Sequence, residues 1–315
     1  MNSLYSLRSI ILAAACCGPF ALSLSAGEPR DLATLGKSQI TTADVDLQLG
    51  RSADPNAKLP PLPEGISMAT VDIIAKQRRA LSTLTKQGNR IADAELNKWL
   101  VENTPSEPKL SPDEALKSRA SGAGLSAEMY RDFLAFRFSW QSYVQQQMNE
   151  TNLTKHFKNQ KKRFDGSRFR IEHAFIAVPP GESKLRTEAH QVLERLRDEL
   201  AGSDIEFAAA AKKLSVEQRL EATSEPLWIT GAGPVLPAVV DTVLKLKESE
   251  LSPVFDSGQA VHVVRLLEIE AGSRAMSDAS EELRRHMLLY LLDYLAKQSE
   301  KELPLKWNEV DQSKP

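Results

Sequence analysis

The chain has 315 residues, of which 42% are hydrophobic and 26% are charged, and its formal net charge at pH 7 is −2. These values are ordinary for a globular protein of about two domains, and they argue against nucleic acid as a partner. The two cysteines, Cys16 and Cys17, both lie in the N-terminal apolar stretch, so a chain that lost this stretch would contain no cysteine.

Residues 1–26 have the pattern of a secretory signal peptide. Arg8 supplies the basic start, residues 10–24 form a short apolar run, and small residues at 25–27 suit a cleavage point. We therefore expect export across the inner membrane into the periplasm. A membrane anchor is the alternative, but the run is short and is broken by a Gly-Pro pair. A lipid anchor through Cys16 is a further alternative, because residues 12–16 loosely resemble a lipobox. No other stretch predicts a stable membrane span.

Residues 27–166 predict a helical domain. Thr41 or Thr42 is suited to cap a first helix, and Gly88 is suited to end a later one in the left-handed conformation. The helices expected after the first lie at residues 71–87, 94–101 with Asp93 as cap, 127–148 with Ser126 as cap, and 154–164, with proline-rich breaks at 54–63 and 104–112. Aromatic residues recur at helical spacing within 127–148, which favours a core face over an exposed apolar groove.

Residues 167–272 predict a second domain with a different pattern. A strand at 168–178 alternates with His173 in its middle, and a strand at 260–269 contains His262. Between them, helical spacing appears at 188–200 and again after Asp204, which is suited to be an N-cap. The breaks at residues 165–166 and 272–273 bracket this unit.

The last predicted helix spans residues 277–303, and a polar tail follows at 304–315. Its apolar stripe consists of Leu283, Met287, Leu291, Tyr294 and Leu295. A helix this apolar must bury its stripe against another element.

Four segments of the second domain, in order, resemble parvulin-type (PpiC or rotamase) peptidyl-prolyl isomerases. They are IEHAFI at residues 171–176, FAAAAKKLS at 207–215, the apolar segment 235–254, and SGQAVHVVRL at 257–266. In the helical region, GKSQITTADVD at 36–46 and GLSAEMYRDFL at 124–134 resemble SurA-like periplasmic chaperones. The resemblance implies an α+β fold: a small antiparallel sheet with surrounding helices, plus an all-α chaperone-like domain completed by the C-terminal helix, as in SurA-like and PrsA-like chaperones.

The resemblance also implies a site. His173 and His262 would form its central pair, with Glu217 as the third polar member, and Val235, Leu236 and Val239 would wall the proline-binding position. Trp228 is the residue that survives from the family's glycine-rich turn. The alternative for each histidine is a structural, hydrogen-bonded role. The valines stand where the family has Met and Phe, so we expect weakened catalysis, which enlarging Val239 would raise.

The implied function is a peptidyl-prolyl cis-trans isomerase and folding chaperone for exported polypeptides that contain X-Pro bonds. The reaction requires neither cofactor nor metal, and we expect none. The alternative is a non-catalytic, peptide-binding periplasmic chaperone with a degenerate parvulin domain. The missing glycine turn and the small pocket residues favour this alternative, whereas the retained histidines favour the enzyme.

Overall fold

The computed structural model describes residues 30–51, 64–105, 109–179, 182–202, 206–218, 221–223 and 225–308. The predicted signal peptide with Cys16, the proline-rich stretch at 54–63 and the predicted cap Asp204 lie outside these residues. Contacts divide the chain into two compact units, which are described separately. Unit 1 comprises Met1–Asn149 and Leu288–Pro315, and unit 2 comprises Glu150–Met287. The predicted domain boundaries at residues 166 and 272 stay predictions.

Unit 1 is mainly helical. Its elements are β1 (Asp31–Leu35), β2 (Ser38–Thr41), α1 (Thr42–Leu49), α2 (Glu64–Lys86), α3 (Asp93–Asn103), α4 (Pro112–Gly122), α5 (Ala127–Gln147), the C-terminal part of α11 (Ser280–Gln298) and β8 (Leu305–Trp307).

The ends of these helices follow local chemistry. Thr41 caps α1 in a capping box with Asp44, Ser126 caps α5, and Gly88 has φ +72, as predicted. Asp93 is not the cap of α3, because Ala92 holds that position without a side-chain hydrogen bond and Asp93 begins the helix. The sequence analysis missed α4, which Ser111 caps in a second capping box.

A three-stranded sheet makes unit 1 more than an all-α domain. The strand order is β2-β1-β8, with both pairs antiparallel. Strand β8 lies within the stretch predicted to be a polar tail, and it pairs Leu305 with Leu35. The α+β class is confirmed, but the prediction of a purely helical first domain is wrong in this detail. A three-residue strand has too few positions to show an alternating pattern.

The C-terminal helix packs with the N-terminal helices, as expected. Leu291 and Leu295 are buried, and the Thr83 hydroxyl donates to the carbonyl of Leu295 at 2.9 Å. Tyr294 does not belong to the buried stripe: it is 51% exposed and its ring stacks on that of Tyr290, one helical turn earlier. On α5, by contrast, the core interpretation of the aromatics is confirmed for Tyr130, Phe136 and Trp140, which are buried.

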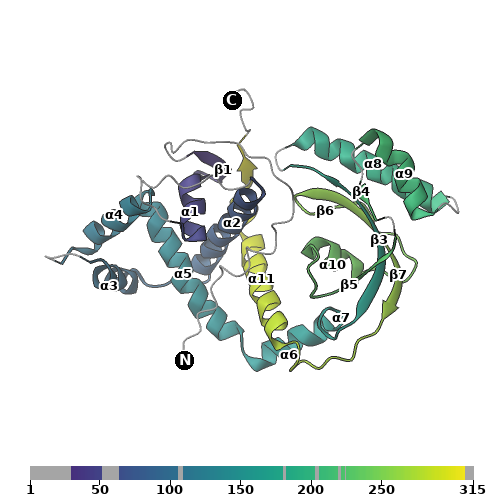
Figure 1. Cartoon of the computed structure of the whole chain (residues 1–315). Coiled ribbons are helices and arrows are strands. Elements are labelled where there is room, and N and C mark those ends of the chain that lie inside the picture. The colour runs from purple at the N-terminus through teal and green to yellow at the C-terminus, as the bar shows by residue number, and fades with distance from the viewer. Residues whose placement is uncertain are drawn as a thin grey trace. The chain divides into compact units, whose positions relative to one another are not determined.

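Unit 2 contains a five-stranded antiparallel sheet with helices on both faces (Figure 1). Its strands have the order β4-β3-β7-β6, and β5 also pairs with β3. Its elements are α6 (Glu150–Asn159), α7 (Lys161–Phe164), β3 (Arg168–Ala177), α8 (Ser183–Gly202), α9 (Phe207–Gln218), β4 (Glu221–Ala222), β5 (Leu227–Thr230), α10 (Pro237–Val243), β6 (Phe255–Asp256), β7 (Ala260–Glu270) and the start of α11.

Alternation along β3 and β7 creates two separate apolar clusters. Ala174 and Ile176 face α8 and α9, where Phe207 is fully buried. Phe169 and Ile171 face the opposite side and pack with Val239 of α10. In Figure 1, α8 and α9 lie on one side of the curved sheet and α10 lies on the other. The face that carries α10 is also the face of His173, two residues beyond Ile171.

None of the helices in the described residues is both long enough and apolar enough to cross a membrane. The 23-residue helix α2 buries one stripe, which includes Val71, Ile74 and Leu84, in the core of unit 1.

Candidate functional site

The histidine pair lies at the centre of the unit 2 sheet. Strands β3 and β7 are antiparallel, and their register sets Phe175 opposite His262 and His173 opposite Val264. His173 and His262 are therefore diagonal neighbours on the same face of the sheet. Nε2 of His173 lies 3.0 Å from Nδ1 of His262, which is a hydrogen-bond distance. The two histidines that the sequence analysis paired are thus in direct contact.

Each histidine is also held by hydrogen bonds to residues outside the pair. The backbone N–H of His173 donates to the Thr223 hydroxyl at 3.1 Å, and the Thr223 N–H donates to the His173 carbonyl at 2.9 Å. His262 Nε2 lies 2.8 Å from the hydroxyl oxygen of Ser257, in the turn between β6 and β7. His262 therefore has a partner at each ring nitrogen, and a hydrogen-bonded chain runs from Ser257 through His262 to His173.

Two phenylalanines extend the pair into an aromatic wall. His262 lies on the middle strand with Phe175 opposite it on β3 and Phe255 opposite it on β6. The rings of Phe255 and His262 stack at a centroid distance of 5.2 Å, and those of His173 and Phe175 at 5.3 Å. Both phenylalanines are partly exposed. The wall is thus apolar at its flanks and polar at its centre.

Both imidazoles are neutral at physiological pH. Burial, together with the neighbouring His262, lowers the pKa of His173 to about 4. Burial also lowers the pKa of His262 to about 4, although the nearby Asp256 carboxylate opposes this shift. A neutral pair suits a reaction in which no proton needs to leave the substrate.

The predicted substrate-binding residues Val235, Leu236 and Val239 differ in how far they are buried. Val239 is 1% exposed and packs inside the cluster on the α10 face, and Val235 is partly buried beside it. Leu236 precedes α10 and is 40% exposed. Among these three residues, only Leu236 presents a large apolar surface to solvent.

Trp228 lies on the other face of the sheet from the histidine pair. It pairs across the strands with Arg170, which alternates with Ile171 and His173, and the guanidinium of Arg168 lies 4.7 Å from its ring centroid. The structure does not bring Trp228 to the histidines. Glu217 lies near the end of α9, and its side chain falls outside the described part of the molecule.

Three residues of the site, Ser257, Phe175 and Phe255, were not predicted from the sequence. Phe175 follows His173 by two residues and so shares its face, a signal that was present in the alternation. Ser257 and Phe255 required the register of the β6–β7 hairpin. A Ser-Gly dipeptide five residues before a strand histidine is too common a turn to be informative without that register.

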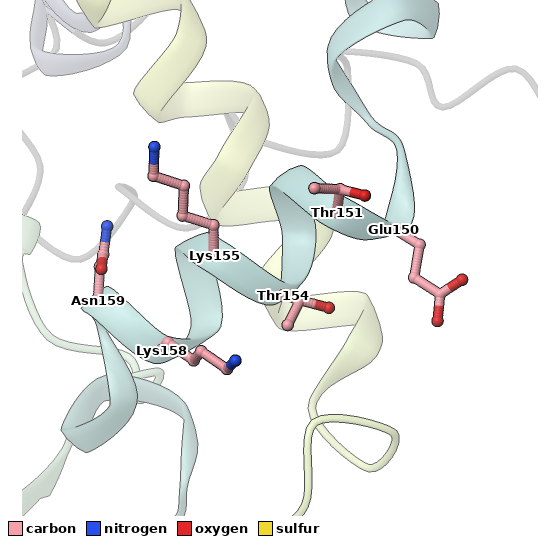
Figure 2. A pocket seen from close by; sticks show the side chains of 6 residues that line it. All are labelled: Glu150, Thr151, Thr154, Lys155, Lys158 and Asn159. Carbon is pink, nitrogen blue, oxygen red and sulfur yellow. The ribbon is translucent and has the colours of Figure 1, made fainter.

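A surface pocket of unit 2 lies apart from the His173–His262 pair. It has a volume of about 550 Å³ and lies along α6, where it is lined by Glu150, Thr151, Thr154, Lys155, Lys158 and Asn159 (Figure 2). All six side chains come from one helix, so they form a solvated polar surface and not a converging site. Within the described residues, no group of three or more His, Cys, Asp or Glu side chains can hold a metal ion.

The segment that contains His173 and His262 matches a known protein family. Residues 173–268 match the family model of the PPIC-type PPIase domain, named Rotamase. Among solved structures, the chain is similar to foldase protein PrsA from Streptococcus pneumoniae str. Canada MDR_19A, with 15% identity, 90% of this chain and 96% of that chain covered, and a TM-score of 0.32. It is also similar to the peptidylprolyl isomerase PrsA from Bacillus anthracis, with 16% identity, coverage of 74% and 96%, and a TM-score of 0.31.

A third similar structure is a Campylobacter jejuni chain from work on PEB4 and Cj1289, described as SurA-like chaperones, with 14% identity, coverage of 87% and 96%, and a TM-score of 0.26. No curated protein matches the chain. The family match therefore rests on one segment: residues 173–268, which contain both histidines, match the PPIC-type PPIase (rotamase) domain.

Proposed function

We propose that this protein is a peptidyl-prolyl cis-trans isomerase and folding chaperone that acts on unfolded or nascent exported polypeptides with X-Pro bonds. The observation that carries the proposal is the hydrogen bond between His173 and His262, which lies inside the segment that matches the rotamase model. The flanking phenylalanines provide the apolar surface that a proline ring requires.

The reaction makes and breaks no covalent bond. Rotation about the X-Pro amide crosses a barrier of ~18–20 kcal/mol, and the catalyst has to favour the twisted amide over the planar one. Neutral imidazoles, with pKa values of about 4, keep their hydrogen-bonding capacity at the centre of the site, where His262 is buried. In this proposal His173 and His262 orient and polarise the amide, and Glu217 is the third polar member near its carbonyl.

Catalysis is weak in this proposal. Val239 is buried in the core, and Trp228 is on the far face of the sheet, so Leu236 and the phenylalanines remain as exposed apolar contacts for the proline ring. The same observation favours the second candidate, a non-catalytic chaperone whose parvulin-type domain only binds peptide.

The cellular part of the proposal rests on the sequence. Residues 1–26 are a cleaved signal peptide, which places the mature protein in the periplasm. Residues 27–166, completed by 277–303, form the chaperone domain, 167–272 form the isomerase domain, and 304–315 follow as a tail. Mass spectrometry of the protein from its native host should find an N-terminus near Ala26 or Gly27. An intact Met1 in a cytoplasmic fraction would refute export, and a diacylated Cys16 would identify a lipoprotein.

A protease-coupled assay with a proline peptide tests the two candidates against each other. The purified protein should accelerate isomerisation, and His173→Ala should lower kcat/KM while thermal melting reports whether the fold survives. If neither protein accelerates the reaction but both suppress aggregation of an unfolded client, the second candidate is correct. Loss of activity together with a collapsed melting temperature would assign His173 a structural role.

A further inference from the structure

The turn between β6 and β7 supplies the serine that contacts His262, and it is held by its own hydrogen bonds. The Asp256 carboxylate accepts the Gly258 N–H at 2.5 Å, and the Ser257 N–H donates to the Ala260 carbonyl at 2.9 Å. Gly258 has φ +87, a left-handed conformation that other residues adopt at a cost. The position of the Ser257 hydroxyl therefore depends on the conformation of the residues on either side of it.

A single arginine of α8, Arg186, binds the residues on either side of Ser257, which are Asp256 and Gly258. One terminal nitrogen of Arg186 donates to the Asp256 carboxylate, and the other donates to the Gly258 carbonyl at 3.0 Å and to the Val178 carbonyl at 3.4 Å. Val178 directly follows β3, the strand of His173. The planar guanidinium thus joins the turn before β7 to the end of β3, which the compact ammonium of a lysine cannot do with the same geometry.

The charge of Arg186 also acts on the histidine pair through Asp256. Burial alone would raise the pKa of Asp256, but hydrogen bonds from Arg186 and Gly258 lower it overall, so the group is a carboxylate. This carboxylate lies near enough to His262 to favour its protonated form. His190, one helical turn after Arg186, lies 4.0 Å from the same carboxylate. Arg186 therefore forms an ion pair with the carboxylate whose charge acts on His262.

We propose that Arg186 is a positioning residue for the His173–His262 pair: it fixes Asp256 and Gly258 so that Ser257 remains hydrogen-bonded to His262. Arg186 acts only through the turn. Its ion pair with Asp256, with side-chain exposures of 23% and 32%, contributes only modest stability. The inference rests on the isomerase activity proposed above.

Arg186→Gln in the full-length protein tests this inference, and Arg197→Gln is the matched control. Arg197 lies on the same helix and pairs with Glu194 at 3.1 Å, away from the turn. We expect Arg186→Gln to lower kcat about tenfold with little change in KM, because small displacements of a catalytic group are costly even when their cause is remote. Arg197→Gln should retain wild-type values.

Imidazole ¹⁵N NMR supplies a readout that does not depend on activity. With Arg186 removed, the uncompensated Asp256 should raise the pKa of His262 from about 4, while Arg197→Gln leaves it unchanged. Should Arg186→Gln fold poorly, Asp256→Asn removes the same ion pair, and it should shift the His262 ring signals through the altered turn. Wild-type kcat and unshifted His262 signals in a folded Arg186→Gln or Asp256→Asn protein would overturn the inference. An inactive wild type with the expected His262 shift would refute the proposed function but support the positioning role.

Discussion

Nε2 of His156 on α6 lies 2.9 Å from Nδ1 of His286 on α11, a second histidine pair within unit 2. Both rings contact the ring of Phe164, and His156 is 7% exposed. Burial, followed by the Arg163 guanidinium and His156, lowers the pKa of His286 to about 3, and burial with Arg163 also lowers the pKa of His156. The sequence analysis assigned no role to this pair.

These two histidines should make the protein sensitive to acid. Histidine in an unfolded chain titrates near 6.5, whereas the folded pKa of His286 is about 3, so the unfolded state binds more protons between these values. The stabilisation is complete above pH 6.5 and is lost as the pH falls from 6.5 towards 3. His173 and His262 contribute in the same direction between 6.5 and about 4. Melting temperatures should stay nearly constant between pH 7.5 and about pH 6.5 and should then fall towards pH 4.5.

The variant His286→Gln tests how much of this loss of stability at low pH comes from the His156–His286 pair. At pH 7.5 the variant should be less stable than the wild type by about 1–3 kcal/mol, because His156 loses a buried hydrogen-bond partner. The difference should shrink as the pH falls, since the variant lacks one of the titrating groups. His190→Gln, at a partly exposed histidine of α8, is the control. A His286→Gln curve parallel to that of the wild type over the whole range would contradict the assignment.

Val239→Phe should destabilise the protein and should not improve its activity. The sequence suggested that a larger side chain would fill a gap at the proline ring, but Val239 is 1% exposed and packs among Phe169, Ile171 and Ile229. Overpacking of a buried position typically costs about 1–3 kcal/mol. Denaturant unfolding monitored by circular dichroism measures this directly. A Val239→Phe protein with wild-type stability and higher kcat/KM would restore the original expectation.

Leu236→Ser probes the apolar contact that remains exposed beside Val239. Because Leu236 is 40% exposed and lies before α10, the change should alter stability by less than about 0.5 kcal/mol. If this side chain contacts the proline ring, KM for a proline peptide should rise several-fold, measured in the same protease-coupled assay. An unchanged KM would remove Leu236 from the substrate-binding residues.

The histidine pair was predictable because it depends on local alternation and on one strand pairing. His173 and Ile171 share a face by their spacing, and strands of matching length with central histidines indicate a common sheet. The position of Trp228 was not predictable in this way. Its face depends on the register between β5 and β3, in which Arg170 is its partner, and a shift of one residue would have turned it towards the histidines.

Helix ends and buried stripes were predicted where a single residue type determines them. Gly88 and Ser126 are examples, since a left-handed glycine and a capping hydroxyl are strong local signals. Tyr294 was placed in the wrong stripe because apolar residues surround most of α11, so the pattern alone does not identify the buried side. Packing against α2, where Thr83 contacts Leu295, decides which residues face inward.

Leu295→Ala should be among the most destabilising single changes in unit 1. Leu295 is 0% exposed, and replacing a fully buried leucine by alanine typically costs about 2–5 kcal/mol. Lys297→Ala, two residues later on the exposed side of α11, is the matched control and should change stability by less than about 0.5 kcal/mol. Thermal unfolding followed by circular dichroism compares the two. Equal effects would mean that α11 does not complete the core of unit 1.

The most direct test of the isomerase proposal is the exchange rate between the cis and trans forms of an Xaa-Pro peptide, measured by NMR with increasing amounts of the purified protein. Uncatalysed exchange takes tens to hundreds of seconds at 25 °C. With His173 and His262 hydrogen-bonded at 3.0 Å, we expect the exchange rate to increase in proportion to the protein concentration. An exchange rate that stays at the uncatalysed value, even when protein and peptide are equimolar, would contradict it.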